Sequence, residues 1–267
     1  MTSGTPTRLG AVSYLNTRPL VHGLDAHPDF VLRFDVPSRC AELLEAGTID
    51  LGTIPSFEYA RNPDYFIVPH VAIASSHAVD SVAMFTRRDI RDIRSIALDT
   101  SSRTSANLLR LLCAAWFKIQ PAFVDAPPDL DRMLAEHDAA LLIGDPALFT
   151  DAPSLGLRKV DLGSVWREMT GLPFVWAFWA GRIDAAGPRV CRALAETRDR
   201  GIPAIDAIAA DFAPGDPARA AKVARYLRES IAYDLDGPFE TGLRTFYTLL
   251  AEHGLLTTRA EPRFFGD

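Results

Sequence analysis

The amino-acid sequence predicts an α/β protein with largely parallel sheets. Short apolar runs of strand length alternate with longer helix-like patterns as far as residue 180. Beyond Pro188 the strand patterns stop and helix-like patterns continue to the end. Four of the early strands also run directly through a polar turn into a helix. Such alternation is typical of strand-helix-strand units, in which helices cover a parallel sheet.

The expected elements follow in order along the chain. Strand-like runs occupy residues 8–13, 30–34, 50–54, 67–75, 81–86, 95–98, 121–124, 139–143 and 174–179. Helix-like stretches occupy residues 19–24, 38–45, 105–117, 130–136, 189–200, 203–212, 217–233 and 239–253, and a further helix opens at Pro55. Gly47 marks a helix end, where glycine is the usual residue. The aromatic run 174–179 fits either the core or a wall facing a ligand.

Composition excludes several classes of protein. The net charge of -6 and the lack of a Lys/Arg-rich run argue against a nucleic-acid partner. The longest uncharged apolar stretch, residues 171–181, is too short to span a membrane. Residues 1–10 lack a basic segment followed by an apolar one, so we expect no secretory signal and a cytoplasmic protein.

Cysteine and histidine spacing carries no metal signature. The three cysteines show no CxxC pair, and the six histidines show no HxH or HxxxH pair. We therefore expect buried, reduced thiols at Cys40, Cys113 and Cys191, and no metal site.

The four strand-to-helix turns share one character. They cover residues 12–20, 51–56, 98–105 and 142–147, and they are rich in hydroxyl groups or begin their helix near a proline. In an open α/β sheet, ligands bind at the carboxyl ends of the strands, where helix N-termini attract anions. One such turn alone could be ordinary helix capping. Four together predict a crevice for a small, oxygen-rich anion.

Five longer stretches carry a family resemblance. They are VSYLNTRPL at 12–20, DLGTIPSFEYA at 50–60, ALDTSSRTSANLL at 97–109, AALLIGDPAL at 139–148 and DLGSVWREMTGLPFVWAFWAG at 161–181. Together they resemble the menaquinone-biosynthesis family of the futalosine pathway, and within it the chorismate dehydratases. The resemblance implies the two-lobed fold of the type II periplasmic binding proteins, with a ligand cleft between the lobes. Lobe one would comprise residues 1–85 and 180–267, and lobe two residues 86–179.

The resemblance also implies a reaction. Chorismate would lose its C4 hydroxyl and C3 hydrogen to give 3-[(1-carboxyvinyl)oxy]benzoate and water, the first step of the futalosine pathway. No cofactor or metal is expected, and the only expected partner is the small-molecule substrate, with no oligomeric state predicted. The sister lyase of the family carries a histidine where this chain has Gly144-Asp145, which favours the dehydratase.

Candidate site residues come from the matching turns. Asn16 and Asp145 are the catalytic candidates: Asn16 near the reacting carbons or the leaving hydroxyl, Asp145 as acid or base or, alternatively, as an N-cap. One carboxylate would bind at the helix start that contains Ser102, Arg103, Thr104 and Ser105, and the other at Pro55 and Ser56. The remaining substrate-binding candidates are Ser13, Tyr14, Thr17, Arg18, Ser81 and Gly144.

These motifs contain no Cys/His pair or carboxylate dyad that could act as a strong base. One hypothesis is that the enolpyruvyl carboxylate of the substrate removes the C3 proton itself. His77 is either a cleft-rim or a surface residue. Three alternatives stay open: a non-catalytic solute-binding protein, the sister 1,4-dihydroxy-6-naphthoate synthase, and the effector domain of a transcription factor. A clamp with donors on both lobes is expected to close on its ligand.

Overall fold

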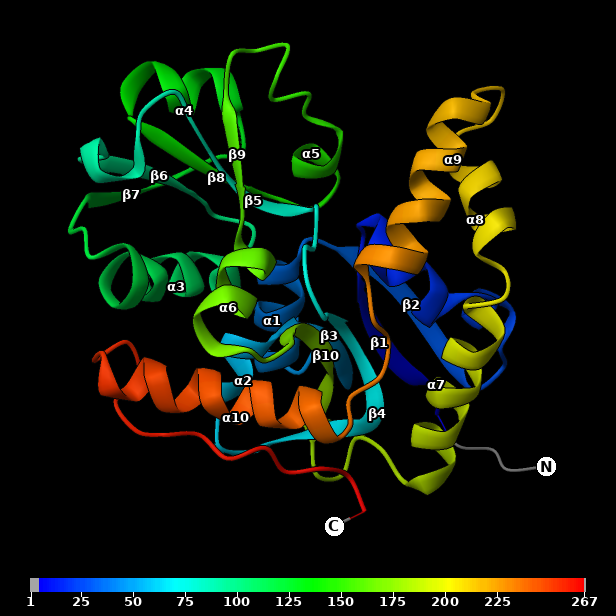
Figure 1. The fold of residues 1–267 in the computed structure, drawn as a ribbon. Coiled ribbons are helices and arrows are strands. Elements are labelled where there is room, and N and C mark those ends of the chain that lie inside the picture. The colour runs from blue at the N-terminus through cyan, green and yellow to red at the C-terminus, as the bar shows by residue number, and fades with distance from the viewer. Residues whose placement is uncertain (1–4, 267) are drawn as a thin grey trace.

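Two sheets, each covered by helices, form two lobes that lie one above the other in Figure 1. The structure is a computed structural model that describes residues 5–266. Residues 1–4 and 267, which the sequence analysis assigned to lobe one, lie outside the described residues. The predicted two-lobed α/β fold is confirmed. The prediction of largely parallel sheets is wrong, because each sheet also contains antiparallel pairs made by the strand that follows a crossing between the sheets.

The first sheet has the strand order β2-β1-β3-β10-β4. Its strands are β1 (Thr7–Val12), β2 (Phe30–Asp35), β3 (Leu51–Pro55), β4 (Tyr65–Ser75) and β10 (Phe174–Arg182). β1 pairs in parallel with β2 and β3, whereas β10 runs antiparallel between β3 and β4. The carboxyl ends of β1 and β3 therefore lie at one edge of the sheet.

The second sheet repeats this plan in the order β7-β6-β8-β5-β9. Its strands are β5 (Val82–Thr86), β6 (Ser95–Asp99), β7 (Ala122–Ala126), β8 (Ala139–Ile143) and β9 (Arg158–Asp161). β6 pairs in parallel with β7 and β8, and β5 runs antiparallel to β8 and β9. In each sheet, the antiparallel strand is the first one after the chain has crossed from the other sheet.

Helices cover both sheets. Around the second sheet lie α3 (Arg103–Leu112), α4 (Leu130–Glu136), α5 (Gly144–Phe149) and α6 (Leu162–Thr170). The first sheet carries α1 (Pro37–Glu45), α2 (Ser56–Arg61), α7 (Pro188–Gly201) and α10 (Gly237–Glu252). The pair α8 (Ile205–Phe212) and α9 (Pro217–Arg225) rises beside both lobes in Figure 1.

Shorter helical turns complete the path. Three are 3₁₀ turns: η1 (Leu15–Val21), η2 (Leu24–Ala26) and η3 (Ile90–Asp92). Two are π-helical turns that follow α3 and α9: η4 (Cys113–Phe117) and η5 (Tyr226–Ser230). The predicted helix at 19–24 is therefore wrong in type and position, since a 3₁₀ turn around Pro19 takes its place. Likewise Pro55 ends β3, and α2 begins one residue later at Ser56.

The chain crosses between the sheets twice. β4 lies in the first sheet and β5 in the second, and the return runs from β9 and α6 into β10. The lobe boundaries near residues 85 and 180 stay a prediction. Sheet membership favours moving them to the two connecting segments, 76–81 and 171–173, so that β5 belongs to lobe two and β10 to lobe one.

Aromatic side chains fill the core where α6 and α10 meet β10. Phe174 lies edge-on to Trp166 and to Phe246, with ring centroids 5.1 and 4.9 Å apart. Trp179 and Phe178 are fully buried as well, so most of the aromatic run 174–179 is core. Burial raises the pKa of the Cys40 and Cys113 thiols to about 12, which suits unreactive side chains, and all three cysteines are free and buried.

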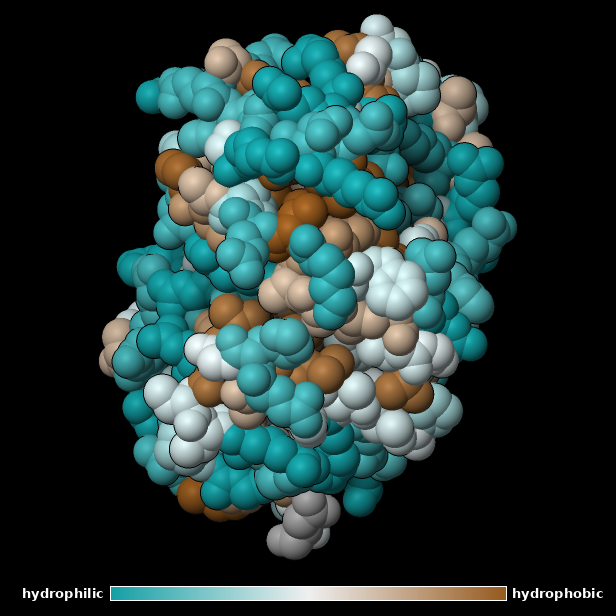
Figure 2. All heavy atoms as spheres, turned by 60° about the vertical axis from the view of Figure 1, so that its left-hand side comes forward, coloured by the Kyte–Doolittle hydropathy of each residue, from teal (hydrophilic) through white to brown (hydrophobic). Residues whose placement is uncertain are grey.

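The face turned forward in Figure 2 is mostly hydrophilic. On the face turned forward in Figure 2, hydrophobic side chains are scattered mainly across the middle, between more polar upper and lower parts. Within residues 5–266, no helix has the length and apolar character needed to cross a membrane.

Candidate functional site

A cavity of about 40 Å³ lies between the two sheets, at the ends of β1, β3 and β8. It is lined by Val12, Tyr14, Asn16, Pro37, Pro55, Ile73, Val79, Val82, Ser102, Ser105, Ile143, Gly144, Trp176 and Ala177. One water molecule in the liquid takes up about 30 Å³. The lobes are therefore shut against each other, and a small-molecule ligand requires them to move apart.

Each of the four predicted turns contributes to this cavity. Tyr14 and Asn16 come from the first, Pro55 from the second, Ser102 and Ser105 from the third, and Gly144 from the fourth. A groove of about 570 Å³ beside α2 and the C-terminal segment is far larger, but none of the predicted site residues line it. We therefore assign the candidate site to the smaller cavity.

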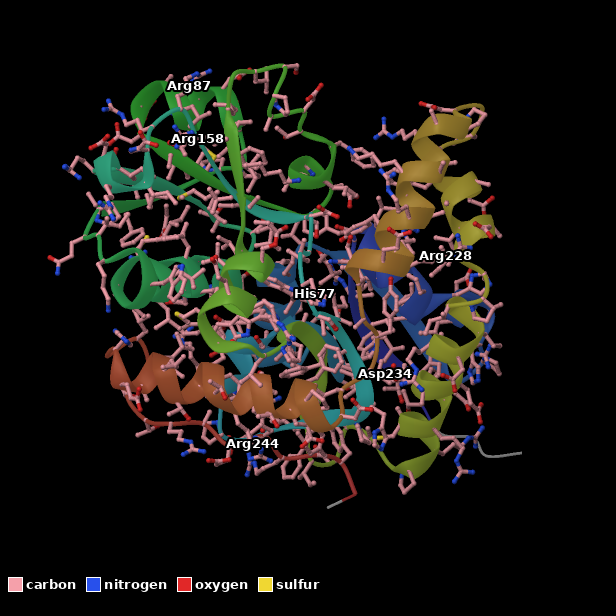
Figure 3. The ribbon with its side chains drawn as sticks, in the orientation of Figure 1. His77, Arg87, Arg158, Arg228, Asp234 and Arg244 are labelled. Atoms are coloured by element: carbon pink, nitrogen blue, oxygen red, sulfur yellow. The ribbon has the colours of Figure 1, made fainter. Side chains whose placement is uncertain are left out.

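The lining is polar in part but holds no fixed charge. No Asp, Glu, His, Lys or Arg occurs among the lining residues. In Figure 3, Arg87 and Arg158 lie at the outer end of the second lobe, and Arg244 lies at the outer side of the first. Neither they nor Arg228, which the figure also labels, line the cavity. In the described part of the chain, no group of three or more acidic, His or Cys side chains could hold a metal ion. An anion at this site would be held by hydroxyl groups and backbone N–H groups.

The start of α3 supplies such donors. Ser102 caps the helix by accepting the Ser105 N–H at 3.3 Å, and the two serine hydroxyls lie 3.0 Å apart. Unpaired N–H groups at a helix start carry a partial positive charge that attracts anions. Both serines line the cavity, as the sequence predicted for the carboxylate-binding turn.

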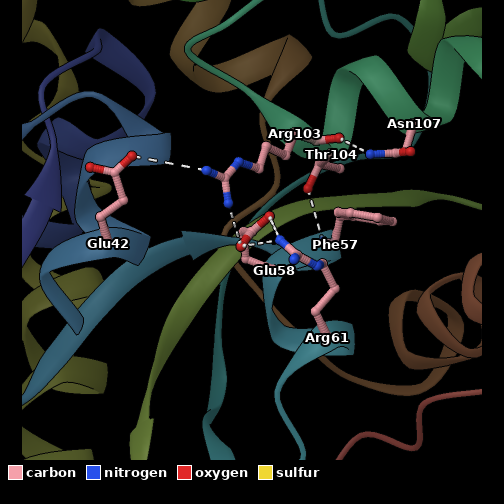
Figure 4. A network of polar contacts seen from close by, with 7 residues as sticks. All are labelled: Glu42, Phe57, Glu58, Arg61, Arg103, Thr104 and Asn107. Carbon is pink, nitrogen blue, oxygen red and sulfur yellow. Dashed lines mark hydrogen bonds and ion pairs between the residues drawn. The ribbon is translucent and has the colours of Figure 1, made fainter. Parts of the chain in front are cut away.

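The neighbouring residues of that turn hold the lobes together instead. Thr104 accepts the backbone N–H of Phe57 at 3.0 Å (Figure 4). The Thr104 hydroxyl also lies 3.4 Å from the Ser56 hydroxyl. Arg103 pairs with Glu58 at 3.0 Å and approaches Glu42 at 3.9 Å. These contacts join α3 of the second lobe to α1 and α2 of the first, so Ser56, Arg103 and Thr104 lie beside the cavity rather than in its wall.

Tyr14 packs across the interface onto Gly144. Gly144 has φ of +64°, and a Cβ there would lie 2.7 Å from the Tyr14 ring. Only glycine avoids both this collision and the strain of a left-handed backbone. The position thus allows the two lobes to approach face to face at the cavity.

A buried hydrogen-bond chain leads away from Tyr14. Its hydroxyl donates to Ser101 Oγ at 3.3 Å, and the Ser101 hydroxyl donates to the Asp99 carboxylate. Asp99 also accepts the N–H groups of Ser101 at 2.8 Å and of Ile143 at 3.2 Å. Burial raises the pKa of Asp99 despite these donors, and burial raises the pKa of Tyr14 as well.

Asp145 does not line the cavity. Its Oδ1 accepts the Leu15 N–H at 3.0 Å, so the carboxylate satisfies the first turn of η1 on the opposite lobe. Burial raises the pKa of Asp145, and the Leu15 N–H, Arg18 and Arg219 partly offset that rise. The predicted alternative was an N-cap of its own helix, but α5 has no side-chain cap.

The other predicted residues have partners outside the cavity. The Ser13 N–H donates to Asp35 O at 2.9 Å, and the exposed Arg18 lies over the Phe34 ring at 5.4 Å. Thr17 is buried behind Asn16 and donates to its Oδ1 at 3.4 Å. Ser81 accepts the Tyr226 hydroxyl at 2.7 Å. His77 is exposed and is not among the lining residues.

Sequence reasoning missed several residues at the site. Trp176 lines the cavity and donates its indole N–H to Ser75 Oγ at 3.0 Å. Asp99 and Ser101 lie inside the predicted turn 98–105, where their polar side chains were an available signal. Tyr226 lies in the helical tail, where no sequence pattern indicated its hydrogen bond to Ser81.

This architecture, with two α/β lobes and a cavity at the strand ends between them, is that of the periplasmic binding proteins. The crystal structure of the periplasmic aliphatic sulphonate binding protein from Escherichia coli matches it with a TM-score of 0.66, over 97% of this chain and 96% of that one, at 19% identity. A crystal structure of an Archaeoglobus fulgidus protein matches with a TM-score of 0.74, over 96% of this chain and 100% of that one, at 17% identity. At these identities the likeness shows the fold alone.

Comparison of the sequence with known families identifies the family of this chain. A family model for menaquinone biosynthesis matches residues 7–252, so the chain belongs to that family. A relative from Thermus thermophilus named chorismate dehydratase is 29% identical over 264 residues, which cover 90% of this chain and 94% of that protein.

Proposed function

We propose that this protein dehydrates chorismate to 3-[(1-carboxyvinyl)oxy]benzoate in menaquinone biosynthesis. The observation that carries the proposal is the cavity wall: hydroxyl and amide donors from both lobes surround a space without fixed charge. Membership of the menaquinone biosynthesis family and the relative named chorismate dehydratase support the choice of substrate.

Chorismate carries two carboxylates, and we assign one to the α3 start, where Ser102 and Ser105 line the cavity. We assign the other to the turn at Pro55 and Ser56, of which only Pro55 lines the shut cavity. Because the Ser56 hydroxyl is buried and donates to Val175 O at 2.9 Å, it can meet a ligand only after the lobes have moved apart. Fixing both groups lets an enzyme choose which bond breaks, because the reacting atoms are held in one geometry. The enolpyruvyl ether would then stay intact while the ring loses its hydroxyl.

The proton at C3 needs a base, and the lining residues supply no carboxylate or imidazole. We assign that task to the enolpyruvyl carboxylate of the substrate. The C3–H electron pair forms the new ring double bond, and the C4–O bond breaks with its electron pair on oxygen. The proton from C3 and the hydroxyl from C4 together make the water product. Aromatisation of the ring supplies the driving force.

Asn16 is the catalytic candidate that lines the wall, and we assign it a hydrogen bond to the leaving hydroxyl. Asp145 was the second catalytic candidate. Because it accepts the Leu15 N–H rather than facing the cavity, we propose that it acts by holding η1, and with it Asn16, in place. Tyr14 and Gly144 would close the wall over the substrate.

We place this reaction at the first step of the futalosine pathway, in the cytoplasm. This part of the proposal rests on the motif resemblance and on the match to the menaquinone biosynthesis family. No cofactor or metal is needed for the bond changes described.

The test is to mix the purified protein with chorismate, follow the loss of chorismate absorbance, and identify the product by mass. The proposal predicts the carboxyvinyloxy-benzoate and water in equal amounts. Binding without turnover would favour the non-catalytic binding protein, and neither binding nor turnover would contradict the choice of substrate. For substrate assistance, an analogue lacking the enolpyruvyl carboxylate is expected to bind but not react. A fully active analogue would contradict that mechanism.

A further inference from the structure

Two hydrogen bonds from the first lobe meet at Ser101 in the second lobe. The Tyr14 hydroxyl donates to Ser101 Oγ at 3.3 Å, and the Ser38 N–H near the start of α1 donates to Ser101 O at 3.0 Å. Ser101 follows β6 and is buried. Its side chain and its backbone therefore both join the lobes, directly beside Ser102 of the cavity wall.

The direction of the hydrogen bonds around Ser101 follows from Asp99. A carboxylate accepts hydrogen bonds but has no hydrogen to donate. Asp99 accepts the Ser101 hydroxyl, the Ser101 N–H at 2.8 Å and the Ile143 N–H at 3.2 Å, and all three bonds favour its ionised form. Because the single hydrogen of the Ser101 hydroxyl goes to Asp99, Ser101 Oγ can only accept from Tyr14. The Tyr14 hydroxyl must therefore donate to Ser101.

The Tyr14 phenol oxygen keeps its capacity to accept a hydrogen bond. With its hydrogen given to Ser101, the phenol has only lone pairs left for another partner. Tyr14 lines the cavity, and its ring packs against Gly144. An acceptor in this wall attracts a hydroxyl group of a ligand and repels a carboxylate. The wall thus combines donors at the α3 start with an acceptor at Tyr14.

We propose that Ser101 is the positioning residue for Tyr14: it holds the phenol hydrogen away from the ligand, so that the phenol oxygen accepts a hydrogen bond from a hydroxyl group of the ligand. Because the Tyr14–Ser101 bond crosses between the lobes, this acceptor is fixed only once the lobes have closed.

The inference deepens the proposed function and rests on it. Chorismate has a single hydroxyl group, the one at C4, beside its two carboxylates. Donors at the α3 start and an acceptor at Tyr14 would bind chorismate in one orientation, with the C4 hydroxyl at Tyr14. Asn16 can donate to the oxygen of the same hydroxyl, because a hydroxyl group both accepts and donates.

The product is a matched ligand, because it keeps both carboxylates but lacks the C4 hydroxyl. The test measures kcat and KM for chorismate, and the inhibition constant of the product, for wild type, Tyr14→Phe and Tyr59→Phe. Tyr59 is the control because it is buried and its hydroxyl donates to Glu261 O at 3.1 Å, outside the cavity.

We expect Tyr14→Phe to raise KM for chorismate about fivefold, as the loss of one neutral hydrogen bond does. We expect its kcat to stay unchanged, since the bond is made in the ground state and the transition state alike. The inhibition constant of the product is expected to stay unchanged as well, because the product has no hydroxyl for Tyr14. Tyr59→Phe is expected to alter none of the three values.

Ser101→Ala tests the positioning itself. It keeps both backbone hydrogen bonds of Ser101 but removes the acceptor for the Tyr14 hydroxyl. We expect KM for chorismate to rise about threefold, again without a change in the inhibition constant of the product. If Ser101 acts through Tyr14, the double variant has the KM of Tyr14→Phe alone, whereas an independent structural loss would multiply.

With an active wild type, three results would overturn the inference: an unchanged KM in Tyr14→Phe, an equal rise in KM and in the inhibition constant of the product, or a further rise of KM in the double variant. If Tyr14→Phe does not fold, Ser101→Ala decides by the same comparison of chorismate with product, and an unchanged KM there overturns the inference. A wild-type protein that leaves chorismate unchanged would instead overturn the proposed function, and this inference with it.

Discussion

The structural role of Asp145 can be separated by mutation from any effect of its charge. Its carboxylate is mostly removed from water and accepts the Leu15 N–H across the lobe interface. An asparagine at this position can still accept that N–H through Oδ1, but it cannot ionise. Asp145→Asn therefore isolates the effect of the charge.

We expect Asp145→Asn to gain stability relative to wild type as the pH rises. Burial raises the pKa of Asp145 in the folded protein above its unfolded value. Its favourable contribution is therefore full below the unfolded pKa, and it is lost as the pH rises through the folded pKa. Urea unfolding at several pH values between 4 and 8 checks this. A difference in unfolding free energy that does not change with pH, or that falls as the pH rises, would contradict the account.

The Ser102 side chain has both a structural role and a proposed binding role. It caps α3 and lines the cavity, so Ser102→Ala removes the acceptor for the Ser105 N–H. We expect the variant to lose about 1 kcal/mol of unfolding free energy and to raise KM for chorismate. Denaturant unfolding and steady-state kinetics measure the two effects. An unchanged KM would show that the α3 start does not hold the substrate.

The residues missed by the sequence analysis share one physical reason. Asp99, Ser101 and Tyr226 act through side-chain contacts between segments far apart in the chain, such as Tyr226 with Ser81. Local patterns predict helix caps and strand ends well, because those depend on neighbours in sequence. They therefore located the turns of Asn16, Ser102 and Gly144. Local patterns do not contain the distances between segments, so they cannot distinguish residues in the cavity wall from residues that hold the lobes together, such as Arg103 and Thr104.

At the scale of elements, the start of α5 meets the opposite lobe through Gly144, which packs against Tyr14. Gly144 and Gly156 both have φ of +64°, but a Cβ at Gly156 would meet nothing within 4 Å. They therefore form a matched pair. Both alanine variants are expected to lose about 1 kcal/mol or more from backbone strain, and only Gly144→Ala pushes against Tyr14.

We expect Gly144→Ala to weaken chorismate binding and Gly156→Ala to leave it unchanged. The extra methyl group at Gly144 keeps the two lobes apart at the cavity, so the donors of the first lobe reach the ligand poorly. Isothermal titration calorimetry of both variants measures their affinities, and unfolding curves measure their stabilities. Equal affinities in the two variants would mean that the Tyr14–Gly144 contact does not control closure.

Element prediction succeeded where apolar patterns were strong. The buried strands β3, β6 and β8 were found to within a residue or two, because their runs are short, apolar and bounded by turn residues. β9 was missed because Arg158–Asp161 is a half-exposed edge strand of polar residues. η1 was misassigned because a helix-starting pattern near Pro19 resolves into a 3₁₀ turn whose first turn is satisfied by Asp145 from the other lobe.

For the whole molecule, the shut cavity implies movement of the lobes. A space of about 40 Å³ cannot admit chorismate, so the contacts that hold the lobes together beside it must break and re-form. The Arg103–Glu58 pair is one of them, with the Arg103 side chain 40% exposed and the Glu58 side chain 10% exposed. The two connecting segments between the sheets are the natural hinges.

We expect small-angle X-ray scattering to show a smaller radius of gyration with saturating chorismate analogue than without it. Ligand contacts on both lobes favour the closed form, and the free protein samples open forms that admit the ligand. High salt is expected to increase the open population by screening Arg103 and Glu58. Identical scattering curves with and without a bound analogue would contradict hinge closure.

The central claim is that the inter-lobe cavity dehydrates chorismate, and one kinetic comparison tests it most directly. Turnover of chorismate, with the product identified by mass, is measured for wild type, Ser105→Ala and Ser154→Ala. Ser105 lines the cavity, while Ser154 is an exposed serine outside it. The account predicts carboxyvinyloxy-benzoate from wild type and Ser154→Ala at equal rates, and a kcat/KM about tenfold lower for Ser105→Ala. No product from wild type, or equal rates for all three proteins, would contradict it.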